Sequence, residues 1–311
     1  MTDTVFLFYG FGSEYVLNLL YSEIKKRGYN CYEVDALNTR NSKTIIKSLI
    51  KRSVVFITSS HFLLDDVNFK DFYPSENKFY NVLQILALIK PKKSVYIPHD
   101  LTQPLINMEN YFLNQFDLFL SPCEPFTSIY SQYCNTEELG WIKYTKKSFE
   151  KNKIKKRGKA IWFVSDFILH MKMGKKKSFK LLSSVLKQGV AIKFQNWDQC
   201  KEFEQYYGKM GAKVFSSTEN SIDLINNHNI IITNGLSSII AESYWLGKTT
   251  INITEGSYYG EERTYLKELF PNLIFIEKTR DFKLSNIVIK KSDVKLAPFN
   301  TNRAIELITK N

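Results

Sequence analysis

The sequence holds little of what marks several classes of protein. Its 311 residues include only 13 Gly and 8 Pro, which argues against low-complexity and disordered classes. The apolar runs are short, and one of the longest, at 81–89, is far below the roughly 20 residues that cross a bilayer as a helix. The first residues lack the basic stretch that begins a signal peptide. We therefore expect a cytoplasmic protein of ordinary globular composition.

Metal-ligating patterns are also missing. The four cysteines form no C-x-x-C pair and no spacing typical of a metal site, so we expect reduced thiols. Three histidines without ligand spacing are interpreted as structural, namely His61, His170 and His228. We predict no metal site and no cofactor.

Positive charge, in contrast, is abundant. The net charge is +12 and the pI is near 9.3, which favours an anionic partner such as a nucleotide, a lipid surface or a nucleic acid. The stretch 143–159 holds nine basic residues and one acid. We interpret it as a solvated linker between domains; contact with a membrane surface or a nucleic acid is the alternative.

Short β-branched segments alternate with longer amphipathic segments along the whole chain. This pattern predicts an α/β fold with parallel sheets and helices on both faces. The alternation restarts after the basic stretch. We therefore predict two Rossmann-like domains facing across a cleft, at 1–148 and 149–311, with a last helix that can pack back on the first domain. The strands are expected at 4–10, 31–37, 53–60, 93–100, 117–122, 160–166, 190–196, 212–217, 229–235, 249–253 and 273–277.

Polar residues gather at the end of one predicted strand in the second half. The segment TNGLSS (233–238) starts a helix, whose unpaired N–H groups and positive dipole end suit a phosphate. Ser237 and Ser238 can cap this helix or donate to phosphate oxygens. Glu242 follows on the same face as Ser238, where a carboxylate can accept from ribose hydroxyls. A serine cap and an early glutamate are also ordinary helix-start residues, and the chemistry alone leaves both interpretations open.

The segment IIITNGLSSIIAESYWLGKTTINI (230–253) resembles the nucleotide-binding segment of GT-B-fold glycosyltransferases and their relatives. Those relatives include non-hydrolysing UDP-N-acetylglucosamine 2-epimerases and CDP-glycerol glycerophosphotransferases. Thr249 departs from the pattern, because members carry proline after the Gly–Lys pair. The resemblance implies that the C-terminal domain binds the nucleotide donor and the N-terminal domain the acceptor. It also implies that Gly235, Ser237 and Ser238 form the phosphate corner and that Glu242 holds the ribose.

The resemblance points to further donor residues. An earlier strand end in this family often carries a basic residue or a His–Pro pair; here it reads IKFQNWD (192–198), without His–Pro, which argues against CMP-sialic-acid and CMP-Kdo transferases. We assign Lys193 to phosphate and Trp197 to base stacking, the alternative being a buried Trp beside a solvated Lys. Glu262 and Arg263, with Glu261, stand where the family often contacts the transferred group.

The first domain has its own polar corner. The segment YIPHDLTQPL (96–105) resembles the Pro–His–Gly corner of this superfamily, with Asp100 in place of Gly. His99 or Asp100 is our candidate general base, and an aspartate helix cap beside a histidine is the alternative. Glu14 is the next candidate base. The turn before it, YGFGSE (9–14), is not G-x-G-x-x-G, so a dinucleotide site is not predicted.

Three functional hypotheses follow. The leading one is a metal-independent GT-B-type glycosyltransferase of cell-surface glycan assembly, with a nucleotide-linked sugar as substrate, a glycan or lipid-linked glycan hydroxyl as acceptor, and peripheral contact with an anionic membrane. The second is a phage-type glycosyltransferase that modifies hydroxylated DNA bases, which the net charge of +12 also fits. The third is a non-catalytic nucleotide-binding protein of the same fold.

Overall fold

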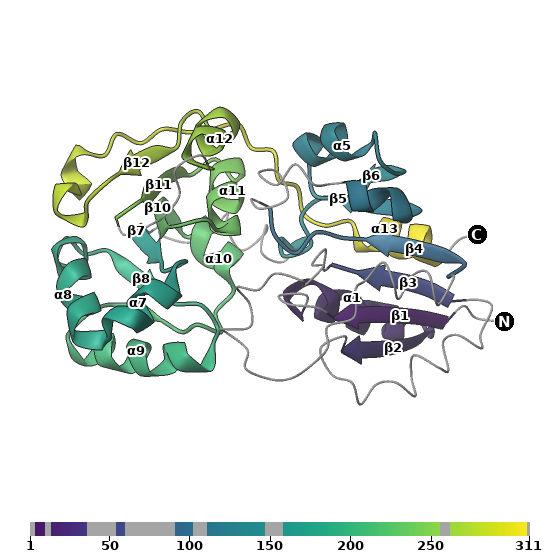
Figure 1. Ribbon diagram of the computed structural model, residues 1–311, viewed down its shortest axis with the longest axis horizontal. Helices are drawn as coiled ribbons and strands as arrows, with labels where there is room; N and C mark the ends of the chain where they lie inside the picture. Colours follow the sequence, from purple (N-terminus) through teal and green to yellow (C-terminus); the bar gives the residue numbers. More distant parts are fainter. Residues whose placement is uncertain are drawn as a thin grey trace. The chain divides into compact units, whose positions relative to one another are not determined.

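The chain divides into two compact units. The computed structural model describes residues 4–9, 14–35, 54–59, 91–101, 111–146, 158–255 and 262–309. The first unit comprises 1–99, 108–145 and 297–311, and the second comprises 100–107 and 146–296 (Figure 1).

The first unit is built on a six-stranded parallel sheet with the order β2-β1-β3-β4-β5-β6. The strands are β1 (Thr4–Tyr9), β2 (Asn30–Asp35), β3 (Val54–Thr58), β4 (Lys93–Tyr96), β5 (Leu118–Ser121) and β6 (Thr136–Glu138). The helices are α1 (Glu14–Lys26), the 3₁₀ helix η3 (Tyr111–Gln115), α5 (Glu124–Tyr130) and α13 (Thr301–Thr309). Strand β3, VVFIT, is buried along its whole length, as expected for a parallel strand with both faces covered.

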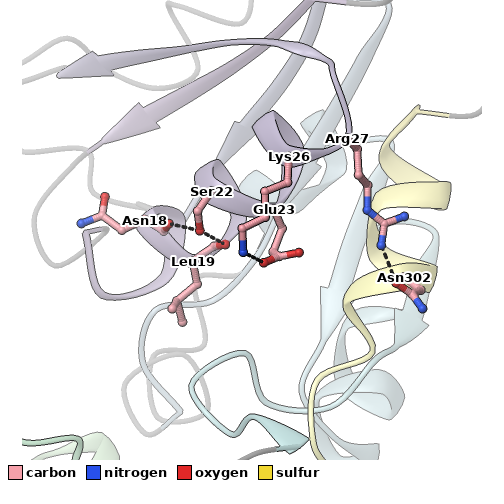
Figure 2. A network of polar contacts seen from close by, with 7 residues as sticks. All are labelled: Asn18, Leu19, Ser22, Glu23, Lys26, Arg27 and Asn302. Carbon is pink, nitrogen blue, oxygen red and sulfur yellow. Dashed lines mark hydrogen bonds and ion pairs between the residues drawn. The ribbon is translucent and has the colours of Figure 1, made fainter.

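The last helix belongs to the first unit, where it contacts α1 and β4. The Arg27 guanidinium, just after α1, donates to the Asn302 side chain of α13 (Figure 2). The Lys93 ammonium donates to the Leu307 carbonyl at 2.7 Å. The chain that returns to α13 passes directly over Gly140, which has a left-handed φ of +85°. A Cβ at this glycine would lie 2.6 Å from the carbonyl oxygens of Ala297 and Pro298, so the crossing requires a residue without a side chain.

The second unit has a six-stranded parallel sheet with the order β12-β11-β10-β7-β8-β9. The strands are β7 (Gly158–Phe163), β8 (Ala191–Lys193), β9 (Val214–Phe215), β10 (His228–Asn234), β11 (Thr249–Ile253) and β12 (Ile274–Ile276). The helices are α7 (Phe167–Met173), α8 (Lys175–Leu186), α9 (Asp198–Lys209), α10 (Ser221–Asn226), α11 (Ser238–Trp245) and α12 (Glu262–Leu269), with the 3₁₀ turns η4 (Thr279–Asp281) and η5 (Leu284–Asn286).

Helices cover both faces of this second sheet. On one face Ile232 and Ile251 pack with Leu182 of α8 and Tyr207 of α9 in one apolar core. On the other face the Thr250 hydroxyl lies 2.9 Å from the Ser243 hydroxyl of α11. The two parallel sheets confirm the predicted α/β class with two Rossmann-like units.

The structure corrects several predicted bounds. The strand expected at 93–100 ends at Tyr96. The Ile97 amide still donates to the Thr58 carbonyl, but Pro98 has no N–H with which to continue the ladder. The strand expected at 212–217 shrinks to two residues. Strand β6 was not predicted, since its sequence TEE offers no apolar alternation. Two further segments with helical periodicity, 42–52 and 79–91, lie outside the described residues except for Pro91.

Candidate functional site

The predicted donor corner lies at the carboxyl edge of the second sheet, where ligands bind in open parallel sheets. Strand β10 ends at Asn234, the backbone turns through Gly235 with a left-handed φ of +71°, and α11 begins at Ser238. Ser237 is the N-cap, and its hydroxyl accepts from the Ile239 amide at 3.3 Å. The structure therefore shows Ser237 in a capping role and a helix N-terminus at the expected strand end.

Asn234 joins two neighbouring strand ends at this edge, a role that the sequence did not reveal. Its Oδ1 accepts from the Trp162 indole at 3.1 Å and from the Ser165 amide, just after β7, at 3.2 Å. The Ser165 hydroxyl in turn lies 2.5 Å from that of Thr233 on β10. The only sequence signal was an asparagine between a β-branched strand and a glycine. Ser165 is thereby a further polar group at the predicted donor corner.

A series of buried polar side chains continues from Asn234 through His170 and Ser178 to Tyr207. His170 Nε2 lies 3.5 Å from Asn234 Nδ2, and His170 Nδ1 lies 2.8 Å from the Ser178 hydroxyl. Ser178 lies 2.6 Å from the Tyr207 hydroxyl. Burial lowers the pKa of His170 to about 4, so the ring is neutral near pH 7. Because the asparagine NH₂ can only donate, Nε2 accepts and Nδ1 carries the proton.

Lys193 is buried at the end of β8, with 5% of its surface exposed. Its ammonium donates to the Ser217 carbonyl at 3.0 Å and to the Phe194 carbonyl at 3.3 Å. Burial lowers its pKa to about 8, opposed by the carboxylates of Glu204, Glu219 and Glu242. The alternative of a solvated lysine is thus wrong. Near pH 7 the side chain is mostly a buried ammonium at the same edge of the sheet as α11.

Glu242 is also buried, with 1% of its surface exposed. Its carboxylate acts on the pKa of Lys193, although more weakly than those of Glu204 and Glu219. Glu242 and Lys193 therefore lie within electrostatic range of each other. A ribose hydroxyl reaches this carboxylate only if the side chains around it move.

Two buried acceptors at this edge lack hydrogen-bond partners in the described part of the chain. They are Asn252 Oδ1, beside Thr233 in the β10–β11 register, and Gln195 Oε1, two residues after β8. Buried polar groups in proteins are almost always hydrogen-bonded. Unsatisfied acceptors at a strand edge are what a site for a hydroxyl- or amine-bearing ligand would present.

Two other residues predicted to contact the donor, Trp197 and Arg263, pack against aromatic rings. Trp197 packs edge-on against Phe167, with ring centroids 6.0 Å apart, and is half-buried. The Arg263 guanidinium lies 5.1 Å from the Phe275 ring centroid and donates to Glu277 at 3.2 Å. Glu262 is the first residue of α12. Glu261 lies outside the described residues.

The candidate base of the first unit lies beside the end of β3. His99 Nδ1 is 2.7 Å from the Ser59 carbonyl oxygen, and the His99 carbonyl accepts from Lys143 Nζ at 3.2 Å. A carbonyl oxygen only accepts, so Nδ1 carries the proton and Nε2 is the basic nitrogen of the neutral ring. Asp100, the other candidate, falls in the second unit. Glu14 begins α1, and the glycine-bearing turn before it lies outside the described residues.

Among the described residues, no group of three or more His, Cys, Asp and Glu could hold a metal ion. The same part of the chain contains no helix with the length and apolar character needed to span a membrane.

Solved structures similar to this chain include GT-B glycosyltransferases. A structure of the wall teichoic acid polymerase TagF is 12% identical, with 98% of this chain and 88% of that chain covered and a TM-score of 0.49. The glycosyltransferase SnogD from Streptomyces nogalater is 14% identical, with 92% and 90% covered and a TM-score of 0.41. Medicago truncatula UGT71G1 complexed with UDP-glucose is 9% identical, with 93% and 87% covered and a TM-score of 0.45. No protein-family model matches the sequence, and the search of curated proteins found no match.

Proposed function

We propose that the chain is a GT-B-type glycosyltransferase that moves a sugar, or a phosphopolyol, from a nucleotide donor to a hydroxyl acceptor. The observation that carries this proposal is the polar cluster at the carboxyl edge of the second sheet. There the N-terminus of α11, the buried ammonium of Lys193 and the Glu242 carboxylate gather where a parallel sheet binds ligands. In this assignment the second unit, mainly 146–296, is the donor domain, and the first unit, which includes the last helix, is the acceptor domain.

The cluster suits a nucleoside diphosphate. Oriented amides at the start of α11 and the Lys193 ammonium favour the negative charge that develops on the leaving diphosphate. A buried charge is costly, so a lysine kept at 5% exposure at a strand end is a candidate for binding an anionic group. The unsatisfied acceptors of Asn252 and Gln195 fit the hydroxyls or amines of a bound donor.

We assign proton transfer to His99. An acceptor hydroxyl attacks the anomeric carbon of the sugar, the bond from that carbon to the diphosphate oxygen breaks, and the hydroxyl proton passes to His99 Nε2. The hydrogen bond from Nδ1 to the Ser59 carbonyl holds the tautomer that this role requires. Such chemistry uses the nucleotide-linked donor as a substrate and needs no cofactor or metal in this proposal. We expect the reaction to take place in the cytoplasm, as a step in the assembly of cell-surface glycans.

A DNA acceptor is the second candidate, favoured by the net charge of +12. The salt dependence of acceptor affinity distinguishes DNA from a glycan, because an affinity that rests on phosphate contacts falls steeply as salt concentration rises. A glycan acceptor should show a much weaker salt dependence.

The test is a thermal-shift panel of UDP-, GDP-, CMP-, CDP- and ADP-linked donors, because a ligand that binds only the folded state raises its melting temperature. We expect one nucleotide class to stabilise the wild type and to stabilise a Ser238→Pro variant less, since proline removes a backbone N–H at the helix start. A Ser183→Ala variant on α8 serves as the control. A flat panel would contradict the proposal. Donor binding without turnover on any hydroxyl acceptor would favour the non-catalytic alternative.

A further inference from the structure

Three exposed aliphatic side chains lie within one short segment of the second unit. Val288, Ile289 and Val294 are 70%, 56% and 69% exposed, the highest values among the exposed large apolar side chains of the described residues. Their segment, 288–295, is part of the yellow-green trace that leads to α13 in Figure 1. We refer to 288–295 as the strip. Isolated exposed aliphatics are normal on protein surfaces, whereas a group of them marks an interaction surface.

The strip is held in place by hydrogen bonds from its backbone and from Ser292 to β11 and α11. The Thr249 hydroxyl, at the start of β11, is 3.0 Å from both the amide and the carbonyl of Lys290. The Ser292 hydroxyl donates to the Tyr244 carbonyl, and the Lys295 amide donates to the Trp245 carbonyl at 2.9 Å. The aliphatic side chains are therefore exposed on an anchored segment and not on a frayed end.

The charge of the strip indicates what it contacts. Lys290, Lys291 and Lys295 are exposed, with Asp293 as the strip's one acid. Lysines among exposed aliphatics suit an anionic lipid surface, where the ammonium groups contact headgroup phosphates and the aliphatic groups enter the acyl boundary. A DNA partner would contact the lysines and leave the aliphatic side chains exposed to water. A second copy of the chain would bring like charges together.

We propose that the strip docks the protein on an anionic membrane surface. This surface differs from the basic stretch 143–159, and the proposal does not depend on the transferase activity. Thr249 is the first residue of β11, so the strip is tied to the amino edge of the sheet. The donor corner lies at the carboxyl edge, where β10 ends. Docking through the strip therefore leaves the donor corner accessible.

The experiment is co-sedimentation of the full chain with vesicles of phosphatidylcholine alone and with vesicles containing about one-third phosphatidylglycerol. The wild type should bind the anionic vesicles and not the neutral ones. We expect Val288→Ser/Ile289→Ser and Lys290→Glu/Lys291→Glu each to lower the partition coefficient by about tenfold or more, through lost apolar burial and lost charge attraction respectively.

A matched control changes an exposed lysine and an exposed apolar side chain at the end of α9, in Lys209→Glu/Met210→Ser. It should bind the anionic vesicles like the wild type, and all variants should melt within a few degrees of it, since the altered side chains are exposed. The proposal is overturned if the wild type binds neither vesicle or both equally. It is also overturned if the strip variants keep wild-type binding, or if they abolish self-association in sedimentation velocity while the wild type ignores vesicles.

Discussion

Lys193 gives a prediction in which stability and binding move in opposite directions. The substitution Lys193→Met keeps the length and apolar stem of the side chain and removes the ammonium. Burying that ammonium disfavours the folded state, so its removal should stabilise the protein near pH 7. Because we assign the same charge to the donor's phosphates, Lys193→Met should also bind a nucleotide donor more weakly.

The magnitude follows from the pKa of Lys193. A fall from the ordinary 10.5 to about 8 corresponds to about 3 kcal/mol against the folded state at pH 7. The carbonyls of Phe194 and Ser217 lose a donor in the variant, which costs about 1–2 kcal/mol. We therefore expect a net stabilisation of about 1–2 kcal/mol, together with a loss of about tenfold or more in donor affinity.

The pH dependence of the unfolding free energy tests the sign of this burial penalty independently. Between pH 8 and 10.5 the unfolded lysine holds a proton that the folded one has released, so wild-type stability rises with pH across this range. Below pH 8 both states are protonated and the penalty is constant. The variant lacks this rise, so its advantage should shrink as pH increases to about 9.

The assay is urea unfolding of the wild type, Lys193→Met and the exposed control Lys187→Met at pH 7 and about pH 9, with donor titrations at pH 7. The reasoning is refuted if Lys193→Met is less stable than the wild type at pH 7 and shows the same pH slope. Unchanged donor affinity in a more stable Lys193→Met would leave the burial argument intact and remove Lys193 from the donor site.

Three further predictions concern other residues. Burial holds the pKa of His170 near 4, so wild-type stability should fall by up to about 3 kcal/mol as pH drops from 6.5 to 4, and urea unfolding should show a smaller fall in His170→Gln. His99→Ala should lower turnover by about 10²–10⁴ with donor affinity and melting temperature nearly unchanged; retention of more than about half the turnover would move the base to Asp100 or Glu14. Gly140→Ala should cost about 2 kcal/mol or more in urea unfolding, because its Cβ meets two carbonyl oxygens, whereas Gly189→Ala, with a similar φ of +79° and open space, should cost about 1 kcal/mol.

The sequence predicted both sheets well because their strands are short apolar runs with helical segments between them. Strand β3, VVFIT, is buried throughout, and β10 ends at the expected corner. Strand β6 was missed because TEE is polar, and only pairing with β5 makes it a strand.

The candidate site was predicted less completely, because its contacts join residues distant in sequence. The burial of Lys193 depends on carbonyls such as that of Ser217, 24 residues away. Asn234 meets Ser165 across 69 residues. Local patterns placed the helix start and its serine cap, but they carry no information on which side chains are buried beside them. Glu242 illustrates this limit, since its helix position was expected and its 1% exposure was not.

The central claim, a nucleotide donor site at the carboxyl edge of the second sheet, is tested most directly by the dissociation constant of the best donor for Glu242→Gln. Glutamine keeps the size of the side chain and removes the charge that would accept from ribose hydroxyls. The matched control is Glu268→Gln, an exposed glutamate on α12. We predict an increase in Kd of about tenfold or more for Glu242→Gln, from a lost charge-assisted hydrogen bond, and a change below about twofold for Glu268→Gln. Equal Kd values for a folded Glu242→Gln and the wild type would contradict the account.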